Sequence, residues 1–255
     1  MRNLRLIPRL DVKQGWLIKG VQMEGWRKVG DPAEYAKAYA DAGADELFFL
    51  DVVASLYNRN NLHDIVERVA SSVFVPLTVG GGIRSYDDAS ALLGRGADKV
   101  ALNTAATDNP ALITEISNAF GSQATVITIE AIRSGGDKWE AMTDNGRNHT
   151  GRDVVEWARE VEDRGAGEIM VVSINRDGTG KGYELDLLEK VSANATVPVV
   201  ASGGLQTPQH LADLINQTSV SAASVAAALH WKKTDFTALR GVLGENGCYV
   251  RPLRG

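Results

Sequence analysis

The chain has 255 residues, 44% of them hydrophobic, and a formal net charge of −5. This length and apolar content suit one domain with a single large core, and without a dense Lys/Arg stripe we expect no nucleic-acid partner. No apolar run approaches the roughly 20 residues that cross a bilayer, and the N-terminal run is interrupted too early for a signal peptide. We therefore expect a cytoplasmic protein that makes no membrane contact.

Cysteine and histidine do not indicate a metal site or a cofactor. Cys248 is the single cysteine, so it has no partner for an internal disulfide. The four histidines, at positions 63, 149, 210 and 230, lack the i,i+4 spacing that places two metal ligands on one helix face. We expect neither a metal ion nor a cofactor.

Short apolar runs alternate with helix-like stretches along the chain. Continuous apolar runs of this length are typical of parallel strands that are buried on both faces. Helix starts follow several of them, since Asp31 precedes Pro32 as a capping residue and Ser85 stands three residues before Asp88, as in a capping box. The predicted strands are residues 4–10, 46–50, 75–79, 99–102, 124–129, 168–173, 197–201 and 221–225.

Two segments recur at one offset. The run from Val75 to Gly82 returns from Val197 to Gly204, 122 residues later, and the same offset relates Gly43-Ala44 to Gly165-Ala166. Two matches at one offset indicate an internal duplication. Together with eight alternating strands, this predicts an α/β fold, a single (β/α)8 TIM barrel of residues 1–255 with half-barrels of approximately 1–122 and 123–255.

Glycines close the third and seventh strands, in matching positions of the two halves. Missing side chains let backbone N–H groups approach an anion closely, and phosphate sites are frequent at this end of the fold. A single glycine pair could simply allow a tight turn, but two pairs in register favour a substrate with a phosphate at each end. The first predicted cradle consists of Gly81, Gly82, Asn103 and Thr104, and the second is built around Gly203 and Gly204.

Acidic residues follow four of the predicted strands. Asp11 and Glu130 occupy corresponding places in the two halves, so they should face each other across the barrel mouth, where such a pair can act as general acid and base. Asp51 and Asp177 are expected to position hydroxyl groups of a sugar-like substrate. The alternative for Asp11, Glu130 and Asp51 is capping of the following helix. The long connections 11–30 and 131–150 are candidate lids.

Longer motifs resemble one family, the cyclase subunit of imidazole glycerol phosphate synthase, over essentially the whole chain. They include Ile7-Pro8-Arg9-Leu10-Asp11-Val12-Lys13, Val79-Gly80-Gly81-Gly82-Ile83, Asn103-Thr104-Ala105-Ala106, Arg176-Asp177-Gly178-Thr179 and Ala201-Ser202-Gly203-Gly204. The resemblance implies a lyase of histidine biosynthesis. Ammonia from a glutaminase partner would cross the barrel, attack a phosphoribulosyl bis-phosphate substrate and close an imidazole ring.

The resemblance also implies residue roles. Asp11 matches the catalytic aspartate, Lys19 a substrate-binding lysine of a mobile first loop, and Gly178 lies in a substrate-binding motif. Asp45 and Asp98 match positions that contact the glutaminase on the N-terminal barrel face. An ammonia gate on the same face is implied for Arg5, Glu46, Lys99 and Glu168. Without the resemblance, these four charges could equally be a stabilising cluster.

Several positions depart from the family pattern. Glu130 stands where the family has its second catalytic aspartate, and Arg9 replaces a cysteine beside Asp11. Ile132, Asn175 and Ala227 replace a lysine, an aspartate and a phosphate-binding serine, although a backbone N–H at Ala227 can still bind phosphate. Two alternatives therefore stay open: a paralogue that delivers ammonia to another acceptor such as a nucleotide-sugar, and a non-catalytic barrel that binds a glutaminase.

Overall fold

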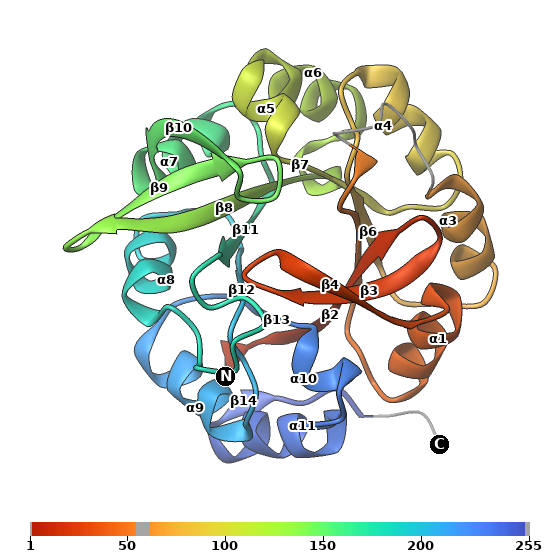
Figure 1. Cartoon of the computed structure of the whole chain (residues 1–255), viewed down its shortest axis with the longest axis vertical. Helices are drawn as coiled ribbons and strands as arrows, with labels where there is room; N and C mark the ends of the chain where they lie inside the picture. The colour runs from red at the N-terminus through yellow and green to blue at the C-terminus, as the bar shows by residue number, and fades with distance from the viewer. Residues whose placement is uncertain (1, 55–61, 253–255) are drawn as a thin grey trace.

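The computed structural model describes residues 2–54 and 62–252, and its centre is a closed barrel of eight parallel strands (Figure 1). The barrel closes because the eighth strand pairs with the first and the fourth pairs with the fifth. The predicted (β/α)8 TIM barrel is therefore confirmed. Its strands are β2 (Arg5–Lys13), β5 (Leu47–Asp51), β6 (Leu77–Gly80), β7 (Lys99–Leu102), β8 (Thr125–Gly135), β11 (Glu168–Ser173), β12 (Val199–Ser202) and β13 (Ala222–Val225).

Helices form a ring outside the barrel (Figure 1). The predicted starts at Asp31 and Ser85 are both present: the Asp31 side chain accepts the N–H groups of Ala33 and Glu34, and the Ser85 side chain accepts that of Asp88. The longer helices are α1 (Pro32–Asp41), α3 (His63–Ala70), α4 (Tyr86–Leu93), α6 (Ala111–Phe120), α7 (Val154–Asp163), α8 (Leu185–Ser192), α9 (Pro208–Gln217) and α11 (Phe236–Glu245). Shorter turns are α5 (Thr104–Asp108), η1 (Ser122–Ala124) and α10 (Ala227–His230).

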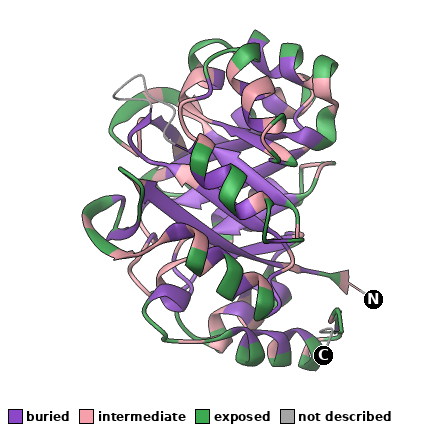
Figure 2. Cartoon of the chain, turned by 90° about the vertical axis from the view of Figure 1, so that its right-hand side faces the viewer, coloured by how far each residue is buried: buried purple, intermediate pink, exposed green. Residues whose placement is uncertain are grey.

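The strands divide the core into two layers. Even-numbered residues of β2, such as Leu6 and Leu10, pack outward in the large core beneath the helices, whereas Ile7 belongs to a smaller apolar cluster inside the barrel. Figure 2 shows the resulting pattern of buried strands surrounded by helices that are exposed on their outer faces. Because side chains alternate along a strand, Arg5 and Arg9 share the inward face of β2 with Ile7.

The two long connections are antiparallel hairpins. The predicted ends of the first and fifth strands were wrong, because β2 continues to Lys13 and pairs with β3 (Trp16–Val21), and β3 pairs with β4 (Glu24–Gly30). In the same way, β8 continues to Gly135 and is followed by β9 (Lys138–Thr143) and β10 (Asn148–Asp153). Gln14 and Gly15, with φ of 51° and 80°, form the left-handed type of turn that suits a tight hairpin.

Strand β1 (Arg2–Asn3) pairs with β14 (Cys248–Tyr249) near the N-terminal ends of the barrel strands. Among the described residues, the structure has no helix that combines the length and apolarity of a membrane span.

Candidate active site

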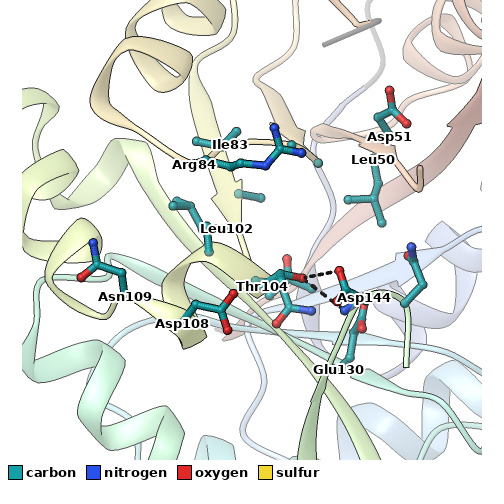
Figure 3. Close-up of a pocket in the computed structure, with 17 residues that line it drawn as sticks. Leu50, Asp51, Ile83, Arg84, Leu102, Thr104, Asp108, Asn109, Glu130 and Asp144 are labelled. Carbon is teal, nitrogen blue, oxygen red and sulfur yellow. Dashed lines mark hydrogen bonds between the residues drawn. The ribbon is translucent and has the colours of Figure 1, made fainter. Parts of the chain in front are cut away.

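The first predicted phosphate cradle lies in a cavity of about 440 Å³ at the C-terminal ends of the strands (Figure 3). Gly81 and Gly82 have φ of 98° and 74°, and a Cβ on Gly81 would overlap the backbone of Asp51. Glycine is therefore needed at this turn. The structure brings six predicted site residues together in the cavity lining: Asp51, Gly81, Gly82, Asn103, Thr104 and Glu130.

The second cradle has nearly the same backbone and far less space. Gly203 has the same φ as Gly81, 98°, and a Cβ there would stand 2.8 Å from the carbonyl oxygen of Ser173. The cavity beside it measures only about 20 Å³. Its lining includes the remaining predicted substrate residues, which are Lys19, Asp177, Gly178, Gly203, Gly204 and Ala227.

The β3–β4 hairpin lies against the loop that borders the second cradle. Gly178 packs so closely on the backbone of Gly20 that a Cβ would overlap it, and the N–H of Gln22 donates to the carbonyl oxygen of Asp177 at 2.8 Å. Figure 1 shows this hairpin crossing the barrel opening. The predicted first lid is therefore docked on the loop that follows β11.

Four buried charges meet where the hairpin contacts the barrel, and one of them, Lys19, belongs to β3. Arg9 Nε donates to Asp11 Oδ1 at 2.7 Å, and Lys19 Nζ lies 3.4 Å from Asp11 Oδ2 and 2.8 Å from Asp177 Oδ2. Burial by itself would raise the pKa of Asp11, but the Arg9 guanidinium and the Lys19 ammonium outweigh it and lower that pKa. Asp11 is therefore a carboxylate, and Lys19 and Asp177 neutralise each other in this arrangement.

Glu130 has a different environment. Its strand, β8, stands across the barrel from β2, with three strands between them on either side. Glu130 is buried, and its Oε2 accepts the N–H of Gly146 at 2.8 Å. Burial raises its pKa to about 7, although the Gly146 N–H and Arg9 act in the opposite direction. A carboxyl of this kind can exchange a proton near neutral pH.

The four predicted gate residues form a closed ring of ion pairs at the other end of the barrel. Arg5 binds Glu46 through one guanidinium nitrogen and Glu168 through the other. Lys99 Nζ lies 3.1 Å from Glu46 Oε2 and 2.9 Å from Glu168 Oε2. Each cation therefore contacts both anions, so the ring is stabilising whether or not it also controls ammonia entry.

Asp45 and Asp98 both contact the backbone at this end. Asp45 Oδ2 accepts the N–H of Leu6 at 2.9 Å, and Asp98 Oδ2 accepts the N–H of Leu77 at 2.8 Å. These bonds fix the first residues of β2 and β6. The two aspartates thus have a structural role in addition to the predicted partner contact.

The substituted positions fit their surroundings. Ile132 packs against the apolar cluster inside the barrel, and Asn175 Oδ1 accepts the N–H of Arg133 at 2.8 Å. Ala227 begins α10 beside the small cavity.

Sequence reasoning missed residues that border the first cavity. Arg84 and Asp144 both line it, and Figure 3 shows them reaching it from different elements. The Arg84 guanidinium also donates to the carbonyl oxygen of Ala54 at 2.6 Å. Its place directly after Gly81-Gly82-Ile83 was a usable signal, whereas nothing local marked Asp144. His230, whose Nδ1 lies 2.7 Å from the Tyr39 hydroxyl, was also missed.

A closed β/α barrel whose strand ends carry a glycine-lined cavity and buried carboxyl groups has the architecture of a barrel enzyme. A family model described as "Histidine biosynthesis protein" matches residues 5–235. The chain is 47% identical over 253 residues to imidazole glycerol phosphate synthase subunit HisF of Myxococcus xanthus (strain DK1622), covering 99% of this chain and 100% of that protein.

A second relative has the same name. The chain is 60% identical over 205 residues to imidazole glycerol phosphate synthase subunit HisF of Legionella pneumophila, which covers 80% of this chain and 97% of that protein. The chain therefore belongs to the HisF family of imidazole glycerol phosphate synthase subunits, and the family resemblance found in the sequence is confirmed.

Proposed function

We propose that this chain is a cytoplasmic lyase, the cyclase subunit of an imidazole glycerol phosphate synthase. Ammonia would convert the phosphoribulosyl formimino aminoimidazole carboxamide ribotide into imidazole glycerol phosphate and aminoimidazole carboxamide ribotide. The observation that carries the proposal is the pair of equivalent glycine cradles with Asp11 and Glu130 between them. A substrate with a phosphate at each end suits two such cradles, and family membership supports the same reaction.

The two carboxyl groups would do the proton chemistry. Ammonia attacks the ribulosyl carbonyl carbon, and the nitrogen then has to lose a proton. Cleavage of the bond to the aminoimidazole product requires a proton on the leaving nitrogen. Asp11 and Glu130 are buried groups at the barrel mouth that can supply these transfers and orient the intermediate.

The Gly81-Gly82 and Gly203-Gly204 turns would bind the phosphates through backbone N–H groups, and Asn103, Thr104 and the N–H of Ala227 would complete the cradles. Lys19 would contact substrate once its hairpin moves, because its ammonium now pairs with Asp177. Asp51, Asp177 and Gly178 would position the sugar part. The hairpin would then need to open before substrate enters the second cradle.

A glutaminase subunit would dock on the N-terminal face and form a heterodimer. The ring of Arg5, Glu46, Lys99 and Glu168 lies on that face and would gate ammonia, with Asp45 and Asp98 beside it. Phe74 supports the same surface, because its side chain is 91% exposed two residues before Pro76, whose carbonyl oxygen accepts the N–H of Leu47 at the start of β5. An exposed aromatic side chain is a typical anchor of a protein interface.

The test is turnover of the purified chain with the ribulosyl bis-phosphate substrate and excess ammonium, at mildly alkaline pH. We expect release of aminoimidazole carboxamide ribotide, followed by mass spectrometry, and no requirement for the partner when ammonium is supplied. Asp41→Asn, on the exposed face of α1, is the matched control for Asp11→Asn. Substrate binding without turnover, unchanged by Glu130→Asp, would contradict the proposal.

Residues at the barrel mouth favour one second candidate function. Arg9 and Glu130 both stand at positions where the family pattern differs, and the cavity at the second cradle measures only about 20 Å³. An ammonia-using synthase with another acceptor, such as a nucleotide-sugar, would keep the barrel and its gate while changing these residues. Glu130→Asp separates the two candidates, since it should raise the rate with the bis-phosphate substrate only if that is the acceptor.

A further inference from the structure

Arg9 is a buried cation at the barrel mouth. It lies on the inward face of β2 with only 2% of its surface exposed, and its Nε donates to Asp11 two residues further along the strand. Its Nη1 atom is buried and has no hydrogen-bond partner within the described part of the chain. A buried guanidinium with one free nitrogen is costly, so its position calls for a reason beyond packing.

The two carboxyl groups of the site differ in what surrounds them. Asp11 is fully buried between two cations, Arg9 and Lys19, at 2.7 and 3.4 Å. Glu130 is also buried, but its contacts are hydrogen bonds from the Gly146 N–H and from Asn103, and it has no salt bridge among residues 2–54 and 62–252. The same residue class therefore occupies two electrostatic environments in one site.

We propose that Arg9 is a positioning residue that keeps Asp11 as a permanent carboxylate and leaves Glu130 as the group that gains and loses the transferred proton. This inference rests on the proposed function and deepens it. It divides the work of the acid/base pair, which the sequence left undivided.

The charges that face each carboxyl group support this division. Asp11 faces Arg9 from its own strand, Lys19 from β3 and His230 from α10, with Asp177 on the far side of Lys19. Arg9 and Lys19 balance Asp11 and Asp177, so this cluster is neutral when all four are ionised. Protonating Asp11 would leave an unpaired buried cation, which is unfavourable.

The charges around Glu130 do not balance in this way. It faces the Asp144 carboxylate, the Asn103 side chain, the Gly146 N–H and, at longer range, Arg9. Glu130 forms no salt bridge among the described residues, and Arg9 compensates its charge only in part. Burial, with a smaller contribution from the Asp144 carboxylate, raises the pKa of Glu130 to about 7, so both protonation states are accessible during turnover.

One proton of the reaction can pass through Glu130. Ammonia forms a C–N bond to the ribulosyl carbonyl carbon; two of its protons leave with the carbonyl oxygen as water, and the third goes to the Glu130 carboxylate, which becomes a carboxylic acid. The same nitrogen then bonds to the formimino carbon and closes the ring, while the bond from that carbon to aminoimidazole carboxamide ribotide breaks. The bonding electron pair goes with the leaving nitrogen, which takes the proton from Glu130. Glu130 ends each turnover as it began, and Asp11 stays ionised and orients the intermediate.

The test is a ¹³C NMR titration of the side-chain carboxyl groups of Asp11 and Glu130, because it requires no substrate. In the unaltered chain we expect Glu130 to titrate near pH 7 and Asp11 to stay ionised throughout the titration of Glu130, because Arg9 and Lys19 lower the pKa of Asp11. Arg9→Met should move the Glu130 midpoint upward by roughly half a unit or more, and Arg9→Lys should restore it. Arg159→Met, which removes an exposed arginine of α7, is the matched control.

A second variant covers the case in which Arg9→Met does not fold. Asp11→Asn keeps Arg9 and removes its anion, so the freed positive charge should lower the Glu130 midpoint by a similar amount. A midpoint that moves in neither variant would overturn the proposal, as would a titration near pH 7 by Asp11 instead of Glu130.

The pH profile of kcat/KM supplies the readout that links Arg9 to catalysis. We expect its acidic limb to follow the Glu130 midpoint in the unaltered chain, in Arg9→Met and in Arg9→Lys. A uniform loss of rate in Arg9→Met, with an unshifted profile, would mean that Arg9 acts through packing alone and would refute the inference. If the NMR midpoints behave as expected but the bis-phosphate substrate is not turned over, the proposed function fails and the division between the carboxyl groups stands.

Discussion

Each end of the barrel holds a cluster of charged side chains, and the two clusters differ in how their charges are compensated. At the N-terminal end, two cations and two anions form a closed ring whose arginine and lysine side chains are 20% and 18% exposed. At the C-terminal mouth, Arg9, Lys19, Asp11 and Asp177 form an equally balanced set that is almost completely buried, and Glu130 is added to it. Each charge of the ring is paired, whereas Glu130 at the mouth forms no salt bridge among the described residues.

This difference indicates where chemistry can occur. A complete ring in contact with water has every charge compensated, so no member needs to change its protonation state. An unpaired carboxyl group in a dry site has a shifted pKa and can move a proton. Substitutions at either end test this difference. We expect their effects to decrease from the mouth to the ring, and from the ring to the surface around it.

The largest effect is expected at the mouth. Asp11→Asn removes the carboxylate that orients the intermediate, so kcat with ammonium should fall by at least about 1,000-fold. Substrate affinity should stay within a few-fold, because the cradles are untouched and Arg9 and Lys19 are freed to meet an anionic substrate. Single-turnover kinetics and calorimetric titration with substrate would measure the two quantities, with Asp41→Asn as the control. Lost binding would show that Asp11 is a binding residue instead.

An intermediate effect is expected at the ring. Glu168→Gln leaves Arg5 and Lys99 with one anion between them, and should lower the free energy of unfolding at pH 7 by about 2 kcal/mol, less than for a fully buried pair. Urea denaturation measures it. Glu67→Gln is the control, because Glu67 forms an exposed pair with Arg95 that contributes little.

The ring prediction has a pH dependence with a definite sign. Burial acts to raise the pKa of Glu168, but Arg5 and Lys99 outweigh it, so the pKa lies below its ordinary value of 4.5. The stabilisation is therefore fully present above pH 4.5 and is lost as the pH falls through the lower pKa of the folded state. The difference between the unaltered chain and Glu168→Gln should shrink in acid. A difference that stays constant down to pH 3 would exclude the ring as its source.

The smallest effect is expected on the surface beside the ring. Asp98→Lys should weaken binding of the glutaminase by about tenfold, because it reverses a charge at the proposed interface. Asp98→Asn separates charge from structure, since its amide oxygen can still accept the N–H of Leu77. Phe74→Ala should weaken binding by a similar factor without a change in stability, because the side chain is solvent-exposed. Surface plasmon resonance with the purified glutaminase would measure all three, and unaltered binding would argue against this face.

Local sequence patterns were sufficient to predict the barrel. Buried parallel strands have to be apolar on both faces, so runs such as 168–173 were located to the residue, and others to within a few. The repeated glycines predicted two equivalent turns, and Gly81 and Gly203 share one backbone conformation. That correspondence supports the proposed division into half-barrels.

Other features depended on contacts that no local pattern encodes. The extensions of β2 and β8 were missed, because their continuation is set by pairing with a returning strand rather than by an apolar run. The sequence placed Lys19 in a mobile loop, yet its amine binds Asp177, which is 158 residues away. Such pairs follow from the closure of the barrel.

The sequence by itself therefore determined the fold, the two glycine turns and which charged residues point into the barrel, because periodicity and backbone requirements are local. Only the tertiary structure decided that Arg9 and Lys19 both contact Asp11 while Glu130 has no salt bridge within residues 2–54 and 62–252, and that the cavity is large at one cradle and small at the other. The physical reason is that pKa values and cavity volumes depend on distances between elements that are remote in the chain, and these distances are set when the eight strands close into a barrel.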